Sequence, residues 1–218
     1  MHENIELWND IALIKDDQYF TKWVKQVGKL DHHNGFLHYL RPFLGGTMVD
    51  MGANIGTHSI YYAQFGHVHC FEPNPIAFEC LQHNMKGQDA TLYNVAVGEN
   101  NNYINMSTPE DGNYGAVFTQ SGDQIPTITL DELCLDECDF IKIDVEGDEI
   151  EALRGAKDTI RRFKPVMCIE SNPCTLARKN LTPNDLLITL HAMGYITKQR
   201  VPADISCDLL CEPASRKK

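Results

Sequence analysis

Short apolar runs alternate with amphipathic segments along most of the chain. The runs have the length of buried strands, and several of them end on an acidic residue. The segments between them carry apolar residues at helical spacing, for example Phe78, Leu81 and Met85, in a helix that is predicted to start with Asn74 as its cap and Pro75 at its first position. This alternation predicts an α/β fold in which helices cover both faces of a mostly parallel sheet. The predicted strands end at or near Asp50, Glu72, Val97, Asp144 and Glu170.

The two ends of the chain extend this pattern. Near the start, one face of a helix collects four apolar residues: Phe20, Trp23, Val24 and Val27. Residues 1–45 are therefore expected to form a helical extension that packs on the core, and residues 46–218 to form the main domain. No linker rich in Pro, Gly or Ser separates the two parts. In the tail, a helix that begins after Thr182 and strands at 195–197 and 206–211 are expected to complete the sheet.

Residues 98–126 interrupt the alternation. They are rich in Asn, Gly, Ser and Asp and contain only short alternating segments. We expect a hairpin or excursion at the carboxyl edge of the sheet, and not a second domain. Loops at that edge commonly contact substrates, so Tyr114 is a candidate on the acceptor side. A solvated loop without function is the alternative.

Composition limits the classes of partner. The chain of 218 residues is 43% hydrophobic, and its net charge of −11 disfavours nucleic acid, because phosphate binding needs clustered Lys and Arg. No apolar run reaches membrane-spanning length, and the first residues lack the basic start of a signal peptide. We therefore expect a cytoplasmic protein without a membrane partner. The cysteines, of which Cys70 and Cys168 lie in apolar runs, are expected to be reduced.

The first candidate site lies between Asp50 and Glu72. A strand ends on Asp50, a loop with two glycines follows, and a second strand ends on Glu72, which Pro73 follows. This is the order of a nucleotide-type site, in which the second acid meets ribose hydroxyls. Asn54 stands where a dinucleotide fingerprint has the glycine that admits a pyrophosphate, and Asp50 would repel phosphate but attract positive charge. S-Adenosylmethionine, which carries a sulfonium and an ammonium group, fits this pattern.

A second chemical centre follows the apolar strand that ends at Asp144. This side chain should project from the sheet tip toward the crevice of the first site, and Glu170, at the end of the next strand, adds a carboxylate to the same rim. Lys142 lies on the side of the strand that carries Asp144, so a structural ion pair is its expected role. The acids Asp148 and Glu149 fit a simpler explanation, since negative charge stabilises a helix N-terminus.

Five segments together resemble the FkbM family of S-adenosylmethionine-dependent methyltransferases: VDMGANIGTHS, CFEPNP, NVAVG, TITLDEL and DFIKIDVEGDEIEALRGA. The resemblance runs from about Val49 to Glu170, and the IDVEG segment is its most specific part. It implies a Rossmann-like class I methyltransferase fold, with a seven-stranded sheet of which one strand is antiparallel. It also implies methylation of oxygen, often on a sugar or glycan hydroxyl.

The resemblance further implies a set of cofactor contacts. The glycine-bearing loop would line the methionine end of S-adenosylmethionine, Glu72 would hold the ribose hydroxyls, and residues 94–96 would neighbour the adenine. The expected cofactor-binding residues are Asp50, Gly52, Ala53, Asn54, Gly56, Thr57, Glu72, Pro73, Asn94, Val95 and Ala96.

The expected chemistry needs a base, because an alcohol is a poor nucleophile at neutral pH. Asp144 or Glu146 is the expected base or orienting group, with Glu170 as the alternative. The same carboxylates could instead hold magnesium or calcium, which we do not favour. The expected acceptor is a hydroxyl of a small molecule or glycan. Two other functions stay open: an NAD-dependent oxidoreductase, and a domain that binds S-adenosylmethionine without turnover.

Overall fold

The computed structural model describes residues 1–30, 45–107, 113, 117–197 and 206–214. Tyr114, the predicted acceptor-side residue, lies outside these ranges. The main sheet consists of β3 (Gly46–Met51), β4 (Gly66–Phe71), β5 (Ala90–Tyr93), β10 (Phe140–Ile143), β11 (Val166–Ser171), β12 (Tyr195–Thr197) and β13 (Cys207–Pro213).

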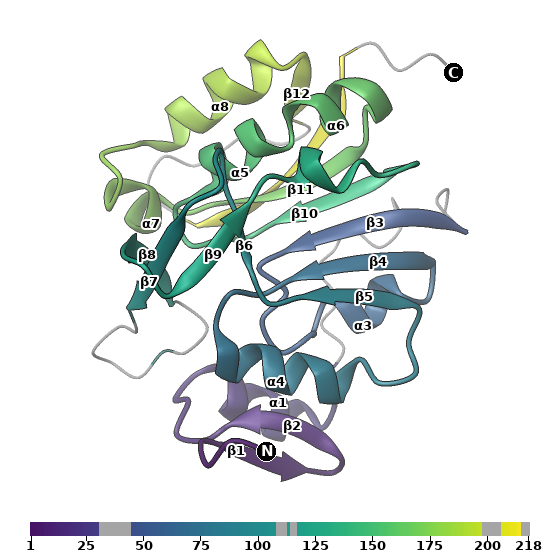
Figure 1. Cartoon of the computed structure of the whole chain (residues 1–218), viewed down its shortest axis with the longest axis vertical. Helices are drawn as coiled ribbons and strands as arrows, with labels where there is room; N and C mark the ends of the chain where they lie inside the picture. Colours follow the sequence, from purple (N-terminus) through teal and green to yellow (C-terminus); the bar gives the residue numbers. More distant parts are fainter. Residues whose placement is uncertain (31–44, 108–112, 114–116, 198–205, 215–218) are drawn as a thin grey trace.

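These seven strands lie in the order β12-β13-β11-β10-β3-β4-β5 (Figure 1). β13 pairs antiparallel with both of its neighbours, and the other adjacent strands pair in parallel. The expected sheet with one antiparallel strand is therefore confirmed, and so are the two strands predicted near the end of the chain.

Helices cover both faces of this sheet, as predicted. One face is packed by α5 (Glu149–Gly155), α6 (Lys157–Phe163) and α8 (Pro183–Ala192), and the other by α3 (Ser59–Tyr62) and α4 (Pro75–Asn84). Val49 and Met51 face the first group, whereas Met48 faces the second, because successive side chains of a strand point to opposite faces. A further short helix, α7 (Pro173–Ala177), follows β11.

The predicted helix starts of α4 and α8 are confirmed. Asn74 accepts the N–H of Ile76 at 3.0 Å, and Pro75 takes the first helical position. Thr182 and Asp185 form a reciprocal capping box at the start of α8. The helix predicted after Asp144 is, in contrast, interrupted at its middle, where α5 ends and α6 begins.

The excursion after β5 forms a small second sheet. It consists of β6 (Ala96–Val97), β7 (Tyr103–Ser107), β8 (Phe118–Ser121) and β9 (Ile125–Ile128), in the order β6-β9-β7-β8. β7 and β8 form the hairpin that the sequence predicts. The single strand predicted to end near Val97 is wrong, because its last residues leave the main sheet and pair with β9. A 3-10 turn over Leu130–Leu133 leads back to the main sheet.

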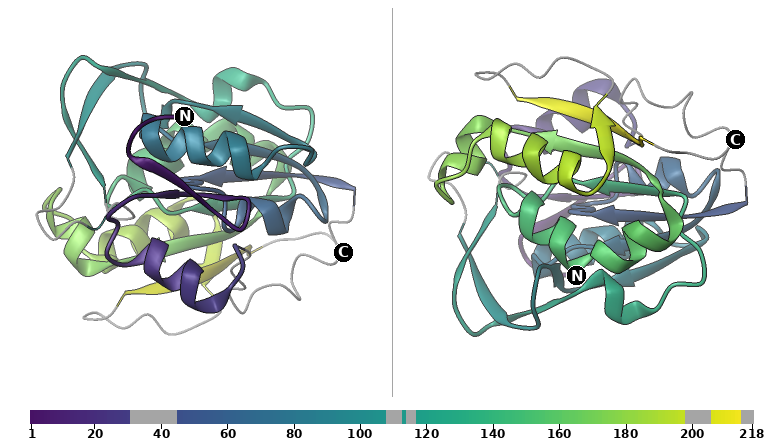
Figure 2. Two further views of the ribbon diagram at one scale, coloured as in Figure 1. Left: turned by 90° about the horizontal axis from the view of Figure 1, so that it is seen from below. Right: turned by 90° about the horizontal axis from the view of Figure 1, so that it is seen from above.

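The N-terminal segment is not wholly helical, which corrects the prediction for residues 1–45. A hairpin of β1 (Ile5–Trp8) and β2 (Ile11–Ile14) precedes α1 (Phe20–Val27). Asn9 and Asp10 connect the two strands with φ of 49° and 64°, the conformation that tight hairpin turns require. An Asn-Asp pair is typical of such turns, so this dipeptide could have identified the hairpin from the sequence. The hairpin packs against α4 (Figure 2), and Val24 of α1 belongs to the same hydrophobic cluster as Ala77 and Cys80 of α4.

Two further observations concern the described part of the chain. Within the described ranges, no helix combines the length and the apolar character that a membrane crossing requires. The eight cysteines are free thiols in this structure.

Candidate active site

A cavity of about 600 Å³ lies at the carboxyl ends of β3, β4 and β10. The loops after these strands form one side of it, and residues of β7 and β8 form another. Phe20 of α1 also reaches its wall. Ligands of open α/β sheets bind in such a crevice, outside the carboxyl ends of the strands. The cavity therefore contains the place where the sequence predicts the cofactor.

The loop after β3 lies tightly against the end of β10. Gly52 has a φ of +84°, and a Cβ atom on it would lie 1.8 Å from the carbonyl oxygen of Asp144, so the approach requires glycine. The amides of Gly52 and Ala53 both donate to the carbonyl oxygen of Phe71 at 3.0 Å. Asn54 follows with a φ of 50° and lines the cavity. Its buried Oδ1 accepts no hydrogen bond from the described residues, so a ligand can provide the donor.

Glu72 lies on the cavity wall with both carboxylate oxygens held. Oε2 accepts the amide N–H of Asn54 and Oε1 that of Asn74, each at 2.8 Å. The residue is only 6% exposed, and burial raises its pKa to about 7 although the two hydrogen bonds favour the charged form. Since a carboxylate oxygen has two lone pairs, each can still accept a ligand hydroxyl. A vicinal diol such as that of ribose matches this geometry.

Asp50 does not line the cavity, and its contact with the cofactor, directly or through water, stays a prediction. The side chain is fully buried, and its Oδ2 accepts a hydrogen bond from the hydroxyl of Ser59 at 2.6 Å. Burial raises the pKa of Asp50, while the charge of Lys142 opposes this effect. The sequence places Asp50 at the strand end, but the loop that follows covers it.

Gly56 and Asn94 also lie outside the cavity lining. An added Cβ on Gly56 would lie 3.0 Å from Cδ1 of Leu81, so this glycine allows α4 to pack closely. Asn94 donates from Nδ2 to the carbonyl oxygens of Glu72 and Pro73, at 2.8 and 3.2 Å, and thereby braces the loop. The other predicted cofactor residues line the cavity: Gly52, Ala53, Asn54, Thr57, Glu72, Pro73, Val95 and Ala96.

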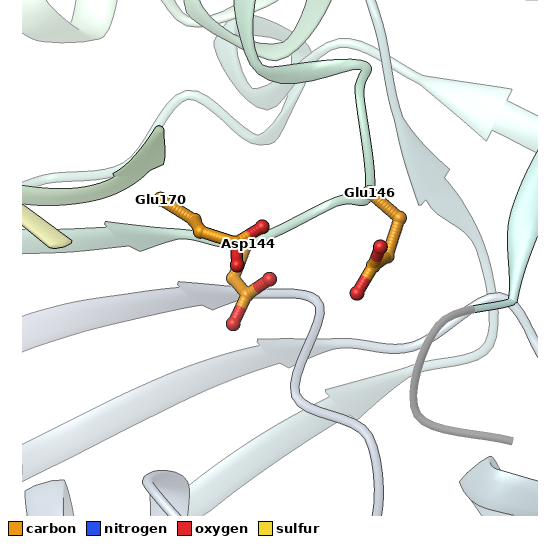
Figure 3. Close-up of side chains that lie close together, drawn as sticks. All are labelled: Asp144, Glu146 and Glu170. Atoms are coloured by element: carbon orange, nitrogen blue, oxygen red, sulfur yellow. The ribbon is translucent and has the colours of Figure 1, made fainter. Parts of the chain in front are cut away.

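Asp144, Glu146 and Glu170 form a carboxylate cluster (Figure 3). One oxygen of each lies within 4.8 Å of the oxygens of the other two. Asp144 follows β10, Glu146 adopts a left-handed backbone with a φ of 56°, and Glu170 belongs to β11. Asp144 and Glu146 line the cavity, whereas Glu170 does not and instead accepts a hydrogen bond from Ser206 at 3.0 Å. The fold thus brings together all three predicted catalytic candidates.

The charges of the cluster are only partly compensated. Lys142, buried with Nζ 2.8 Å from Oδ2 of Asp144, makes the expected ion pair. Burial disfavours its charged form, but Asp144 and Asp50 outweigh this and raise the pKa of Lys142. Burial, with repulsion from Asp144, raises the pKa of both Glu146 and Glu170 to about 8. These two carboxyl groups are therefore largely protonated at pH 7.

Carboxylate oxygens in this arrangement are also the ligand type that hard divalent cations prefer. Two of the three carboxylates, however, already have a protein cation within 4 Å, Lys142 beside Asp144 and Arg178 beside Glu146. These cations offset part of the negative charge that would attract a metal ion.

Glu149 and Asp148, which the sequence predicts only as charges at a helix start, also make specific contacts around the site. Glu149 is fully buried, its Oε1 accepts the N–H of Gly147 at 3.0 Å, and burial raises its pKa to about 7. Asp148 forms an ion pair of 2.6 Å with Lys179 and accepts a hydrogen bond from the hydroxyl of Thr119 on β8. Lys179 also lines the cavity. No local pattern marks Lys179 as a site residue, because only the fold brings these three segments together.

The comparisons with known proteins decide the family. The model of the methyltransferase FkbM domain matches residues 50–197. The chain belongs to the FkbM methyltransferase family. The resemblance carried by the IDVEG segment is thereby confirmed, and S-adenosylmethionine is the methyl donor that membership implies.

Individual relatives of this FkbM chain differ in how much of it they match. The hexuronic acid methyltransferase AglP of Haloferax volcanii is 32% identical over 120 residues, which are 51% of this chain and 50% of that protein. The chain thus spans about half the length of this relative. The solved FkbM methyltransferase of Methylobacillus flagellatus is 22% identical, with a TM-score of 0.53 over 83% of this chain and 48% of that one.

A second solved structure matches this FkbM chain over nearly its full length. The TehB-like S-adenosylmethionine-dependent methyltransferase of Corynebacterium glutamicum is 12% identical, with a TM-score of 0.52 over 91% of this chain and 97% of that one. At these identities the two structures establish the fold, which is the predicted class I methyltransferase fold.

Proposed function

We propose that this FkbM chain transfers the methyl group of S-adenosylmethionine to a hydroxyl group of a sugar or related small molecule. The observation that carries the proposal is a single cavity lined by Glu72 and also by Asp144 and Glu146. Glu72 suits a ribose diol, and the other two carboxylates suit the hydroxyl of an acceptor. Because the Haloferax volcanii relative is named a hexuronic acid methyltransferase, a hexuronic acid is the first acceptor to test.

The residues around Glu72 fit the methyl donor. Gly52 keeps the loop clear of side-chain atoms, Asn54 offers an unpaired oxygen, and Glu72 accepts two hydroxyls. Val95 and Ala96, which line the same cavity, would neighbour the adenine. When bound, S-adenosylmethionine supplies a methyl group on a positively charged sulfur, which is already activated for displacement.

We assign Glu146 as the general base. Its pKa of about 8 lies near neutral pH, where a carboxylate both takes up a proton effectively and is deprotonated often enough to do so. The proton of the acceptor hydroxyl passes to Glu146 as the acceptor oxygen gains the methyl group. Much of the remaining rate enhancement comes from holding the acceptor in line with the methyl group.

Asp144 and Glu170 receive other roles in this proposal. Lys142 donates a hydrogen bond of 2.8 Å to Oδ2 of Asp144 and occupies a lone pair of that carboxylate, so we assign Asp144 to the orientation of a hydroxyl and not to the uptake of its proton. Glu170 lies outside the cavity lining, and when it is deprotonated it disfavours the charged form of Glu146. A divalent cation is not part of the mechanism, and we expect turnover to persist after treatment with a chelator.

The test is an assay with S-adenosylmethionine and glucuronic acid, in which mass spectrometry detects an acceptor that has gained one methyl group. Glu72→Gln should weaken S-adenosylmethionine binding in calorimetry, because a neutral amide accepts hydroxyls less strongly, while Glu6→Gln on the N-terminal hairpin should not. Binding of NAD in place of S-adenosylmethionine would favour the oxidoreductase alternative. Binding of S-adenosylmethionine without methylation of any hexuronic acid, hexose or glycan would favour the alternative of a domain that binds the cofactor without turnover.

A further inference from the structure

Arg178 follows α7 directly and contacts two separate parts of the site. Its guanidinium carbon lies 4.3 Å from the ring centroid of Phe118, the first residue of β8. Its NH1 lies 3.9 Å from Oε2 of Glu146. The ring and the carboxylate therefore hold the cation between the small sheet and the loop after β10. Stacking on an aromatic ring restricts the orientation of a guanidinium, so Phe118 fixes the direction of the charge.

The groups around Glu146 come from every neighbouring element, and most of them are acidic. Asp144 after β10, Glu149 on α5 and Glu170 on β11 all disfavour its charged form. Arg178 is the cation that favours it. The other two cations of the described site are engaged elsewhere, Lys142 with Asp144 and Lys179 with Asp148 (2.8 and 2.6 Å).

The two ion pairs of the cavity differ in a way that matters for proton transfer. Lys142 lies at hydrogen-bond distance from Asp144, so it occupies a lone pair of that carboxylate. Arg178 lies too far from Glu146 for a hydrogen bond, but near enough for its charge to act. Among the described residues, none donates a hydrogen bond to the carboxylate of Glu146, which can therefore accept one from an acceptor hydroxyl.

We propose that Arg178 is a positioning residue that keeps Glu146 available as a base near neutral pH, and that Phe118 of the small sheet holds it in place. The inference rests on the proposed function, in which Glu146 takes up the hydroxyl proton. It makes the small sheet a part of the catalytic apparatus, in addition to a wall of the cavity.

The decisive variants are Arg178→Gln, Arg178→Lys and Phe118→Leu, with Arg161→Gln as the matched control. Arg161 makes an exposed ion pair with Asp158 on α6 and does not line the cavity. Loss of the Arg178 charge should raise the pKa of Glu146 by about one unit. Since the deprotonated form is the active one, kcat rises with pH through this pKa, and the rise moves to higher pH.

At pH 7, kcat of Arg178→Gln should therefore fall about tenfold, and it should recover at a pH above the new pKa. Arg178→Lys keeps the charge but not the planar stacking, so its profile should lie between those of wild type and Arg178→Gln. Phe118→Leu should move the profile in the same direction by less, and Arg161→Gln should not move it. A kcat of Arg178→Gln that is reduced equally at every pH would overturn the proposal, because a structural role alone predicts that result.

A second measurement does not depend on turnover. In protein with ¹³C-labelled Glu side chains and a chelator present, the Glu146 carboxyl resonance, assigned by its absence from Glu146→Gln, can be titrated by NMR. The proposal expects a higher midpoint in Arg178→Gln than in wild type, even if the enzyme methylates another class of acceptor. An unchanged midpoint would refute the role of Arg178 and leave the proposed function intact.

Discussion

At the residue scale, the site contrasts two carboxylates that are two positions apart. Asp144 is held by the buried Lys142, while Glu146 meets a cation only at 3.9 Å and has a pKa of about 8. Their shared motif does not distinguish them, since both follow the same apolar strand. We assign them different roles from these contacts, because a carboxylate oxygen that accepts a hydrogen bond from a lysine has fewer lone pairs left to take up a proton.

Substitution of each residue should separate these roles. Glu146→Gln should lower kcat by about 10²- to 10⁴-fold, the usual contribution of a general base, and leave the binding of S-adenosylmethionine unchanged. Its stability should be unchanged or slightly higher, because a repelled carboxyl group is removed. Asp144→Asn should lower activity and also destabilise the fold, since Lys142 then remains buried without its partner.

We expect the loss in Asp144→Asn to be about 1–2 kcal/mol, because the Asp144 side chain is 31% exposed and water screens the pair. Steady-state kinetics and urea denaturation measure the two effects, and Glu6→Gln is the control. If Glu146→Gln retained the kcat of wild type, Glu146 would not be the base.

At the element scale, the loop after β3 depends on backbone approach. Gly52 and Gly87 have nearly the same φ, +84° and +82°, but their surroundings differ. A Cβ on Gly52 would lie 1.8 Å from a backbone oxygen, while a Cβ on Gly87 would meet nothing within 4 Å. An alanine at Gly87 therefore tests the strain of the left-handed conformation alone, and an alanine at Gly52 adds the steric clash.

We expect Gly87→Ala to cost about 1 kcal/mol of stability, the price of the left-handed backbone alone. Gly52→Ala should cost about 3 kcal/mol or more and should also weaken S-adenosylmethionine binding, because the loop and Asp144 must move apart. Thermal denaturation and calorimetry measure both quantities. Equal stability losses in the two variants would show that β3 and β10 do not need this close approach.

At the scale of the whole molecule, buried acids should make stability fall as pH rises. Burial raises the pKa of Glu72 and Glu149 to about 7 and that of Glu146 and Glu170 to about 8, above the ordinary value of 4.5. Between about pH 4.5 and 8 the folded state therefore binds more protons than the unfolded state. The stabilisation is complete below pH 4.5 and is lost as pH rises through these pKa values.

The melting temperature of the ligand-free protein should accordingly be higher at pH 6 than at pH 8.5. Glu170→Gln should reduce this difference, because it removes one of the groups that titrate in the window. Calorimetric scans across pH 5–9 at constant ionic strength provide the measurement. A melting temperature that rises steadily with pH over this range would contradict the raised pKa values.

The hydrophobic pattern of the sequence was sufficient to predict most strands of the main sheet, because each strand is marked by residues that are neighbours in the chain. The apolar runs and capping residues predicted β3, β4, β10, β11 and the starts of α4 and α8. The N-terminal hairpin was missed because its strands are only four residues long, although the turn at Asn9 and Asp10 signalled it. The split between β5 and β6 could not be predicted, because the choice of sheet depends on a partner 31 positions away, as the pairing of Ala96 with Thr127 shows.

The sequence by itself determined the family, the alternation of strands and helices in the main sheet, and the identity of the acids at the strand ends, because each depends on residues that are neighbours in the chain. Only the tertiary structure decided that Asp50 is covered while Glu72 lines the cavity, that Arg178 lies over the ring of Phe118, and that its guanidinium lies near Glu146. Burial and charge are properties of the space around a side chain. They arise when distant segments pack together, so the spacing of residues in the sequence does not predict them.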